Sequence, residues 1–260
     1  MSISLTIEDD IATLLINRGE QKNAISLAMW HSIPDHVERI VAAKAKVLVV
    51  RGAAHTFSAG ADLSEIANLT NLKDAMNYWI AIRSGVEAIA ELTTTTIALI
   101  EGHCIGGGCL IALACDLRMA ASNAQFALPE VKLGIVCDST SVARLAHLIG
   151  GAAAKEMLLS GDVKNAEQAF RLGLVNEIVL EDRLVSRTYQ LARVLARNNG
   201  EAIARLKRQF HNLSLGITPS PIASAGTFSA EEEDGQIAES FLAPAVKEKI
   251  KQIIGVTRRF

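Results

Sequence analysis

Residues 96–114 of the chain read TIALIEGHCIGGGCLIALA. Two apolar segments, 96–100 and 109–114, flank three consecutive glycines, Gly106, Gly107 and Gly108. This order predicts a buried strand, a tight turn and a helix that begins at the glycines. Glycine lets a ligand approach the main chain closely, and the first N–H groups of a helix have no partner within it. We therefore expect a site here that stabilises negative charge developing on a ligand.

A second loop has the same character. Residues 56–63 read TFSAGADL and follow the apolar segment 46–50, so they form the turn between another strand and another helix. One backbone N–H from each loop could converge on a single oxygen as an oxyanion hole. Glycine turns before helices are common, so close packing is the alternative interpretation for either loop alone. Neither loop carries GxGxxG or a glycine followed by Lys-Ser/Thr, which argues against a dinucleotide or P-loop site.

The rest of the chain predicts an α/β protein with a helical C-terminal third. The acidic turn 8–10 separates the β-branched runs 3–7 and 11–16 into a hairpin. Ser26 is placed to cap a helix through residue 40, and Asn165 with Gln168 forms a capping box for another. The other expected strands are 46–50, 97–100, 117–120, 125–127 and 176–179. The other expected helices are 63–92, a segment from Thr140 onward, 184–198, 201–212 and 244–254, with a break at 216–221.

Composition restricts the partners of the chain. Its 260 residues are 50% hydrophobic, which is ample for a buried core. The 26 basic and 28 acidic residues give a net charge of -2 without a basic stripe, and aromatic residues make up 4%, so nucleic acid is not expected as a partner. We expect no membrane association, because no uninterrupted apolar run reaches the roughly 20 residues that a bilayer span needs. The start of the chain does not resemble a targeting segment.

The cysteines and histidines do not indicate a metal site or a disulfide. Cys104, Cys109, Cys115 and Cys137 form no CxxC pair and lie in apolar surroundings, where a thiol behaves as a small hydrophobic group. His103 lies beside the glycines, but no second ligand follows it at metal-binding spacing. We expect reduced cysteines, no metal and a cytoplasmic location.

Four sequence blocks, in order, carry a family resemblance: residues 57–63, residues 97–102 with the glycines at 106–108, residues 115–118, and residues 126–135. This order resembles the crotonase superfamily, the enoyl-CoA hydratases and isomerases. The resemblance implies a spiral of ββα turns with a C-terminal helical region, assembled as a homotrimer or a dimer of trimers. It implies an acyl-CoA thioester substrate, with coenzyme A as part of that substrate and no separate cofactor. On this basis residues 1–199 form a crotonase-like core with the acyl-CoA site, and residues 200–260 form a helical oligomerisation region.

The resemblance also implies roles for individual residues. The N–H groups of Ala61 and Gly107 would form the oxyanion hole that polarises the thioester carbonyl and stabilises an enolate. Lys22 lies where a cation could meet the coenzyme phosphates, although a surface lysine is the plainer interpretation. The remaining residues expected to contact the acyl-CoA are Ala24, Ala59, Asp62, Leu63, Ser64, Gly106 and Leu110.

The chain departs from the hydratase pattern at one position. Hydratases of this family carry two glutamates; this chain keeps Glu130 but has Leu110 at the other position. Hydration needs two groups to handle the water and its proton, whereas a double-bond shift from C3 to C2 needs a single base. We therefore expect an isomerase in which Glu130 moves the proton, although from composition alone Glu130 could be an exposed turn residue. Asp138 is either a second catalytic acid or the cap of the next helix. A hydratase that uses another acid, and a weak catalyst that only binds CoA esters, remain the alternatives.

Overall fold

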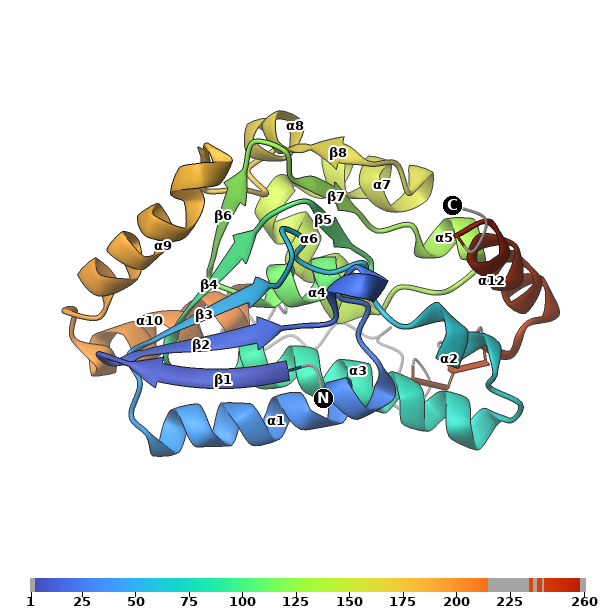
Figure 1. The fold of residues 1–260 in the computed structure, drawn as a ribbon, viewed down its shortest axis with the longest axis horizontal. Helices are drawn as coiled ribbons and strands as arrows, with labels where there is room; N and C mark the ends of the chain where they lie inside the picture. The colour runs from blue at the N-terminus through green and yellow to red at the C-terminus, as the bar shows by residue number, and fades with distance from the viewer. Residues whose placement is uncertain (1–2, 215–233, 236–237, 240, 258–260) are drawn as a thin grey trace, which may run out of the picture.

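The computed structural model of the chain describes residues 3–214, 234–235, 238–239 and 241–257. Its centre is a six-stranded sheet in the order β1-β2-β3-β4-β6-β9 (Figure 1). The β1–β2 pair is antiparallel, and every other neighbouring pair is parallel. The strands are β1 (Ile3–Glu8), β2 (Ile11–Ile16), β3 (Val47–Gly52), β4 (Thr95–Ile100), β6 (Leu117–Ala121) and β9 (Glu177–Val179).

The expected hairpin is confirmed. Asp9 and Asp10 form its two-residue turn with φ values of 49° and 66°, the left-handed region in which aspartate is tolerated better than most residues. The parallel pairs that follow need crossover connections, and helices supply them.

A second, three-stranded sheet in the order β5-β7-β8 completes the spiral. Strands β4 and β5 (His103–Ile105) precede α4 (Gly107–Ala114), and strands β6 and β7 (Gln125–Ala127) precede α5 (Glu130–Leu133). An isolated parallel bridge between Ser58 and Cys104 places the loop after β3 beside β5, before α2 (Leu63–Ala67) begins. The expected ββα spiral is thereby confirmed, and short β8 (Lys164–Asn165) pairs with β7.

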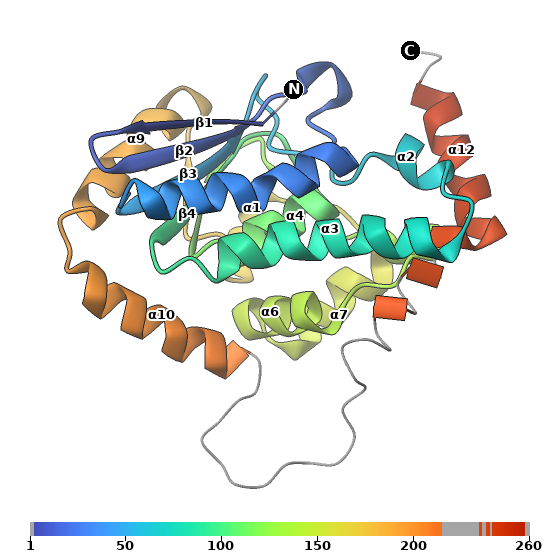
Figure 2. The same cartoon turned by 90° about the horizontal axis from the view of Figure 1, so that it is seen from below.

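Helices cover both faces of the large sheet, which explains why β3 and β4 read as nearly continuous apolar runs. On one face α9 (Glu181–Leu195) packs against alternate strand residues such as Val47, Val49 and Ile97. On the other face Leu48 and Val50 join the main core, where α1 (Leu27–Ala42) and α3 (Leu72–Ala90) lie side by side (Figure 2). The other described elements are η1 (Gly19–Gln21), α6 (Ser139–Ile149), α7 (Gly151–Ser160), α8 (Ala166–Arg171), α10 (Gly200–Ser214) and α12 (Pro244–Thr257).

Helix termini follow the capping chemistry of the sequence, with one correction. Ser26 accepts a hydrogen bond from the N–H of Met29, and Asn165 with Gln168 forms the expected capping box. The expected, largely helical segment 63–92 is not one continuous helix, because α2 ends at Ala67 and α3 begins after Asn71. The side chain of Asn71 accepts a hydrogen bond from the N–H of Asp74 and so starts a new helix, which local apolar periodicity does not reveal.

Two predictions about the C-terminal part stay predictions. The break expected at 216–221 lies outside the described residues, and nothing here tests the division at residue 199. Helix α12 packs against α2 and α5, which brings this end of the chain back to the core. Among the described residues, no helix is long and apolar enough to cross a membrane.

Candidate active site

Backbone pairing brings the two glycine-containing loops together. The N–H of Phe57 donates to Glu101 (2.7 Å), the N–H of Ser58 donates to His103 (2.8 Å), and the N–H of Ile105 donates back to Ser58 (3.0 Å). The last two bonds form the parallel bridge between Ser58 and Cys104 and hold the loop after β3 against β5. They place residues 59–61 directly beside Gly106 and Gly107.

Both loops depend on glycine at the contact. Gly60 has φ +96°, and a Cβ built on it would lie 2.7 Å from the carbonyl oxygen of Ile105 and 3.0 Å from the nitrogen of Gly107. A Cβ on Gly107 would lie 3.3 Å from the nitrogen of Ala61. The amides of Ala61 and Gly107 are therefore close neighbours, and neither donates to another described residue. Such a pair of unpartnered N–H groups is the arrangement that an oxyanion hole requires.

Helix α4 adds to the electrostatic character of this site. It begins at Gly107, has no side-chain cap, and buries all eight of its residues. Its first N–H groups carry the positive end of the helix dipole, and burial lowers the effective dielectric around them. The site is consequently suited to an oxygen that acquires negative charge.

Two buried polar residues hold the first loop in shape. The hydroxyl of Ser58 donates to the carbonyl of Asn23 (2.8 Å) and accepts from the N–H of Gly60 (3.0 Å). The Asn23 side chain donates to the carbonyls of Ala53 (2.8 Å) and Thr56 (2.6 Å). Sequence reasoning did not identify these supporting roles, because only the folded chain brings residue 23 against residues 53–58.

Glu130 faces the same loops from α5. Its Oε1 lies 3.4 Å from the position that a Cβ on Gly106 would occupy, so the absence of a side chain there makes room for the carboxylate. Its Oε2 is buried and has no hydrogen-bond partner among the described residues. Burial, assisted by the nearby charge of Asp138, raises the pKa of Glu130 to about 7. Glu130 is therefore not the exposed turn residue that composition alone allows.

Asp138 has an observed structural role. It is the N-cap of α6, and its side chain accepts from the N–H of Ser141 at 2.8 Å. It also lines the same cavity as Glu130 and influences the pKa of that group. The expected helix cap is confirmed, and a catalytic role for Asp138 stays a prediction.

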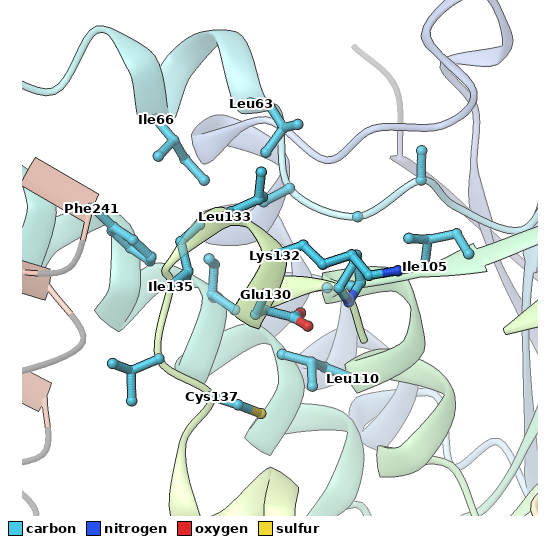
Figure 3. Close-up of a pocket in the computed structure, with 18 of the residues that line it drawn as sticks. Leu63, Ile66, Ile105, Leu110, Glu130, Lys132, Leu133, Ile135, Cys137 and Phe241 are labelled. Atoms are coloured by element: carbon cyan, nitrogen blue, oxygen red, sulfur yellow. The ribbon is translucent and has the colours of Figure 1, made fainter. Parts of the chain in front are cut away.

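Glu130 lies in a cavity of about 330 Å³ with mostly apolar walls. Figure 3 shows its carboxylate beside Leu110, which lines the same cavity. Helix α3 contributes Trp79 and Ile82, and the C-terminal part contributes Phe241 and Ile253.

The residues expected to contact the acyl-CoA fall into two groups. Six of them line the cavity: Ala59, Ala61, Leu63, Gly106, Gly107 and Leu110. The other four, Lys22, Ala24, Asp62 and Ser64, lie on the adjoining segments but do not line it.

Two residues of the second group have structural partners. Asp62 caps α2, accepts from the hydroxyl of Ser64 (2.5 Å) and pairs with Arg18 (2.6 Å). Burial works to raise the pKa of Asp62, but the hydrogen bonds from Ser64 and Arg18 outweigh it and hold that pKa below its ordinary value. Lys22 is exposed, as expected for a surface lysine, while its carbonyl accepts from the N–H of Ala59 (2.9 Å). Contact of these residues with coenzyme A stays a prediction.

The part of the chain that the structure describes contains no group of three or more His, Cys, Asp or Glu residues that could hold a metal ion. Cys104, Cys109 and Cys115 are buried free thiols, as expected, and Cys137 is half-buried. Burial raises the pKa of Cys104 and of Cys115, the latter to about 12, which keeps both thiols protonated.

Comparisons with known proteins agree with this arrangement. The family model described as enoyl-CoA hydratase/isomerase matches residues 6–219. The chain is 35% identical over 214 residues to a crotonyl-CoA hydratase from Syntrophomonas wolfei, with 81% of each chain covered. It is 32% identical over 203 residues to the 2,3-dehydroadipyl-CoA hydratase of Escherichia coli, covering 76% of this chain and 77% of that one. A solved structure of an enoyl-CoA hydratase/carnithine racemase from Magnetospirillum magneticum matches with a TM-score of 0.79 at 30% identity, covering 86% and 84%.

Proposed function

Because the chain belongs to the enoyl-CoA hydratase/isomerase family, we propose that this acyl-CoA enzyme shifts the double bond of a 3-enoyl-CoA to C2. The observation that carries the proposal is that Glu130 and Leu110 line the same cavity. The Glu130 carboxylate lies against Gly106 through its Oε1 and leaves Oε2 buried without a described partner, and an apolar side chain stands where a second acid would be needed. A single base is enough for a proton shift and insufficient for adding water.

The proposed reaction starts at the thioester carbonyl, whose oxygen accepts hydrogen bonds from the N–H groups of Ala61 and Gly107. Glu130 removes a proton from C2, and the electron pair moves through the C1–C2 bond onto the thioester oxygen as a dienolate. The protonated Glu130 then returns the proton to C4, which leaves the double bond between C2 and C3 and regenerates the carboxylate. No cofactor beyond the CoA moiety of the substrate takes part in this scheme.

The pKa of Glu130 suits both halves of this cycle. A carboxylate with a low pKa is a weak base and removes the C2 proton slowly. A group with a high pKa is already protonated before the substrate binds. With a pKa of about 7, Glu130 accepts the proton from C2 and releases it to C4 without a large free-energy difference between the two forms.

Hydration is the second candidate, because the similar proteins described above are named as hydratases. In this alternative Asp138, which lines the same cavity, would hold the water together with Glu130. Its hydrogen bond to the first turn of α6 argues for a mainly structural carboxylate. A protein that binds CoA esters with little catalysis is the third candidate, and Leu110 is the feature that motivates it.

Incubation with a 3-enoyl-CoA and, separately, a 2-enoyl-CoA in deuterated water separates these candidates. The isomerase moves the double bond and exchanges deuterium at C2 and C4; a hydratase yields a 3-hydroxyacyl-CoA; a binder yields neither. Glu130→Gln should lower turnover by about 10³-fold or more while leaving CoA-ester binding nearly unchanged. Retention of activity by this variant would rule out Glu130 as the base.

We also propose assembly as a homotrimer or a dimer of trimers, with residues 200–260 as the oligomerisation region. Supporting this, α10 exposes Leu206 and Phe210, which are four residues apart and share one helix face. Sedimentation equilibrium gives the mass of the assembly directly. A monomer at micromolar concentration would contradict the proposal.

A further inference from the structure

One wall of the cavity around Glu130 is apolar. Ile66, Leu133 and Phe241 line it and are each less than 10% exposed. Figure 3 shows these three side chains, together with Ile135, gathered on one side of Glu130. With the thioester carbonyl at Ala61 and Gly107, as in the proposed function, the acyl chain would extend into this region. We propose that the site selects acyl chains with an uncharged apolar tail and rejects chains that end in a carboxylate.

The charges that line the cavity support this selection. Three of the described lining residues have ionisable acidic or basic side chains other than a thiol: Glu130, Asp138 and Lys132. The two acids have the same sign as a terminal carboxylate and would repel it. The ammonium of Lys132 is bound to Asp162 at 2.7 Å, on the exposed side of α5. Among the described lining residues, the terminal carboxylate of an acyl chain would therefore meet no free cation.

Two neutral N–H donors of the described cavity lining already have acceptors. Among the described lining residues, Trp79 has a neutral side-chain N–H, and it donates to Asp234 at 2.8 Å. The N–H of Gly106 donates to the carbonyl of Ala127 at 2.9 Å. The amides of Ala61 and Gly107 are reserved for the thioester oxygen in the proposed function, on which this inference rests for the direction of the acyl chain.

The expected discrimination is large because the two kinds of tail differ in desolvation. Each buried methylene should improve affinity by about fourfold until the cavity is filled. A carboxylate buried without a partner should weaken binding by about 100-fold or more relative to a methyl group at the same position.

Isothermal titration at pH 8 with hexanoyl-CoA, adipoyl-CoA and the terminal methyl ester of adipoyl-CoA tests the inference. The three ligands share a six-carbon acyl chain, and only adipoyl-CoA carries a terminal charge. We expect hexanoyl-CoA to bind about 100-fold more tightly than adipoyl-CoA, and the methyl ester to recover at least tenfold of the loss. Affinities of hexanoyl-CoA and adipoyl-CoA within about threefold would overturn the inference. So would a methyl ester as weak as the free acid, since size and not charge would then exclude the tail.

A charge-introducing variant gives an independent arm. Ile135 is half-buried at the cavity wall, so a lysine there can keep its ammonium near water without disrupting the core. Ile135→Lys should improve adipoyl-CoA binding by about tenfold, and the matched neutral variant Ile135→Gln should not. Equal effects of the two variants would contradict the charge argument.

These saturated ligands cannot be turned over, so the result is separable from the proposed reaction. Selective binding without isomerase activity would contradict the proposed function but support the inferred substrate class. Isomerase activity with equal binding of both tails would do the reverse. Failure of every CoA ester to bind would overturn both.

Discussion

Glu130 and Leu110 set the chemistry of the cavity at the scale of single residues. Glu130 is the first residue of a four-residue helix, and its Oε2 is buried without a described partner. Desolvation disfavours its charged form, and the like charge of Asp138 acts in the same direction. Leu110, one turn into α4, adds an apolar surface where a second carboxylate would change the reaction. In the proposed function, the reaction type depends on the side chain at position 110, while the oxyanion hole is formed by backbone N–H groups.

The raised pKa of Glu130 predicts the pH dependence of the enzyme. A general base must be ionised, so kcat/KM should be level above pH 7 and fall about tenfold per pH unit below it. Asp138→Asn keeps the helix cap but removes the like charge, so it should move this limb to lower pH. A rate profile measured from pH 5 to 9 checks both effects. A limb near 4.5, the ordinary value for glutamate, would show that Glu130 is not desolvated in solution.

Leu110 can be tested by restoring a carboxylate. Leu110→Glu should introduce measurable hydration of a 2-enoyl-CoA and reduce isomerisation, because two acids would then flank the space next to C3. Leu110→Gln has the same size without the charge and should not hydrate. Chromatographic detection of 3-hydroxyacyl-CoA provides the readout, and equal hydration by the wild type would show that Leu110 does not decide the reaction.

At the scale of elements, the start of α4 is closely packed against two other helices. The indole of Trp30 on α1 lies behind Gly107, and a Cβ on Gly107 would approach its Cζ2 to 3.0 Å. Gly85 on α3 meets the same ring, with its Cβ position 3.1 Å from Cε3. Helices α1, α3 and α4 therefore meet at one aromatic side chain, which holds the oxyanion loop against Ala61.

Gly107→Ala should lower kcat by about 10²- to 10³-fold, the usual cost of losing one oxyanion donor. The added methyl group would press on Trp30 and on the nitrogen of Ala61. Gly151→Ala is a matched control, because nothing lies within 4 Å of the Cβ position at Gly151. Steady-state kinetics and circular dichroism together separate loss of catalysis from loss of folding. An unchanged kcat in Gly107→Ala would disprove the assignment of the hole.

At the scale of the whole molecule, the C-terminal part is fastened to the core beside the cavity. Asp234 is 7% exposed, accepts from the indole N–H of Trp79 and forms an ion pair with Arg83. Phe241 stands edge-on to Tyr78, with ring centroids 6.2 Å apart. Lys247 on α12 donates to the carbonyl of Leu69 between α2 and α3. Helix α3 and the C-terminal part of the chain therefore contribute together to the cavity wall.

Asp234→Ala should destabilise the protein by about 1–3 kcal/mol, because it leaves the N–H of Trp79 buried without an acceptor and Arg83 without its partner. It should also raise KM for the acyl-CoA, since Trp79 and Phe241 line the cavity. Glu167→Ala is the control, as its pair with Arg171 is exposed and should change stability by less than about 0.5 kcal/mol. Urea denaturation measures the stability of the two variants. Equal stability of the two variants would show that the fastening contributes nothing.

Local patterns along the chain are enough to predict much of this protein. Apolar runs, capping residues and glycines predict the strands of the large sheet, β7, the starts of α1 and α8, and the two loops that meet, because each depends on neighbours a few residues away. These patterns do not predict the short strands β5 and β8. They do not predict the separation of α2 from α3, which depends on a polar cap at Asn71 within a helical pattern. The ordered blocks add the family, which the comparisons confirm.

Tertiary structure alone decides how the residues of the site meet. It packs Trp30 behind Gly107, buries Glu130 against Gly106, and brings Asn23 to the loop after β3. The pKa of Glu130 also belongs to this level, since desolvation depends on all the atoms around a group and not on its neighbours in sequence. Residue types and spacing thus determine which groups are available for chemistry. Folding determines their distances and the dielectric around them, and these two quantities set the reaction.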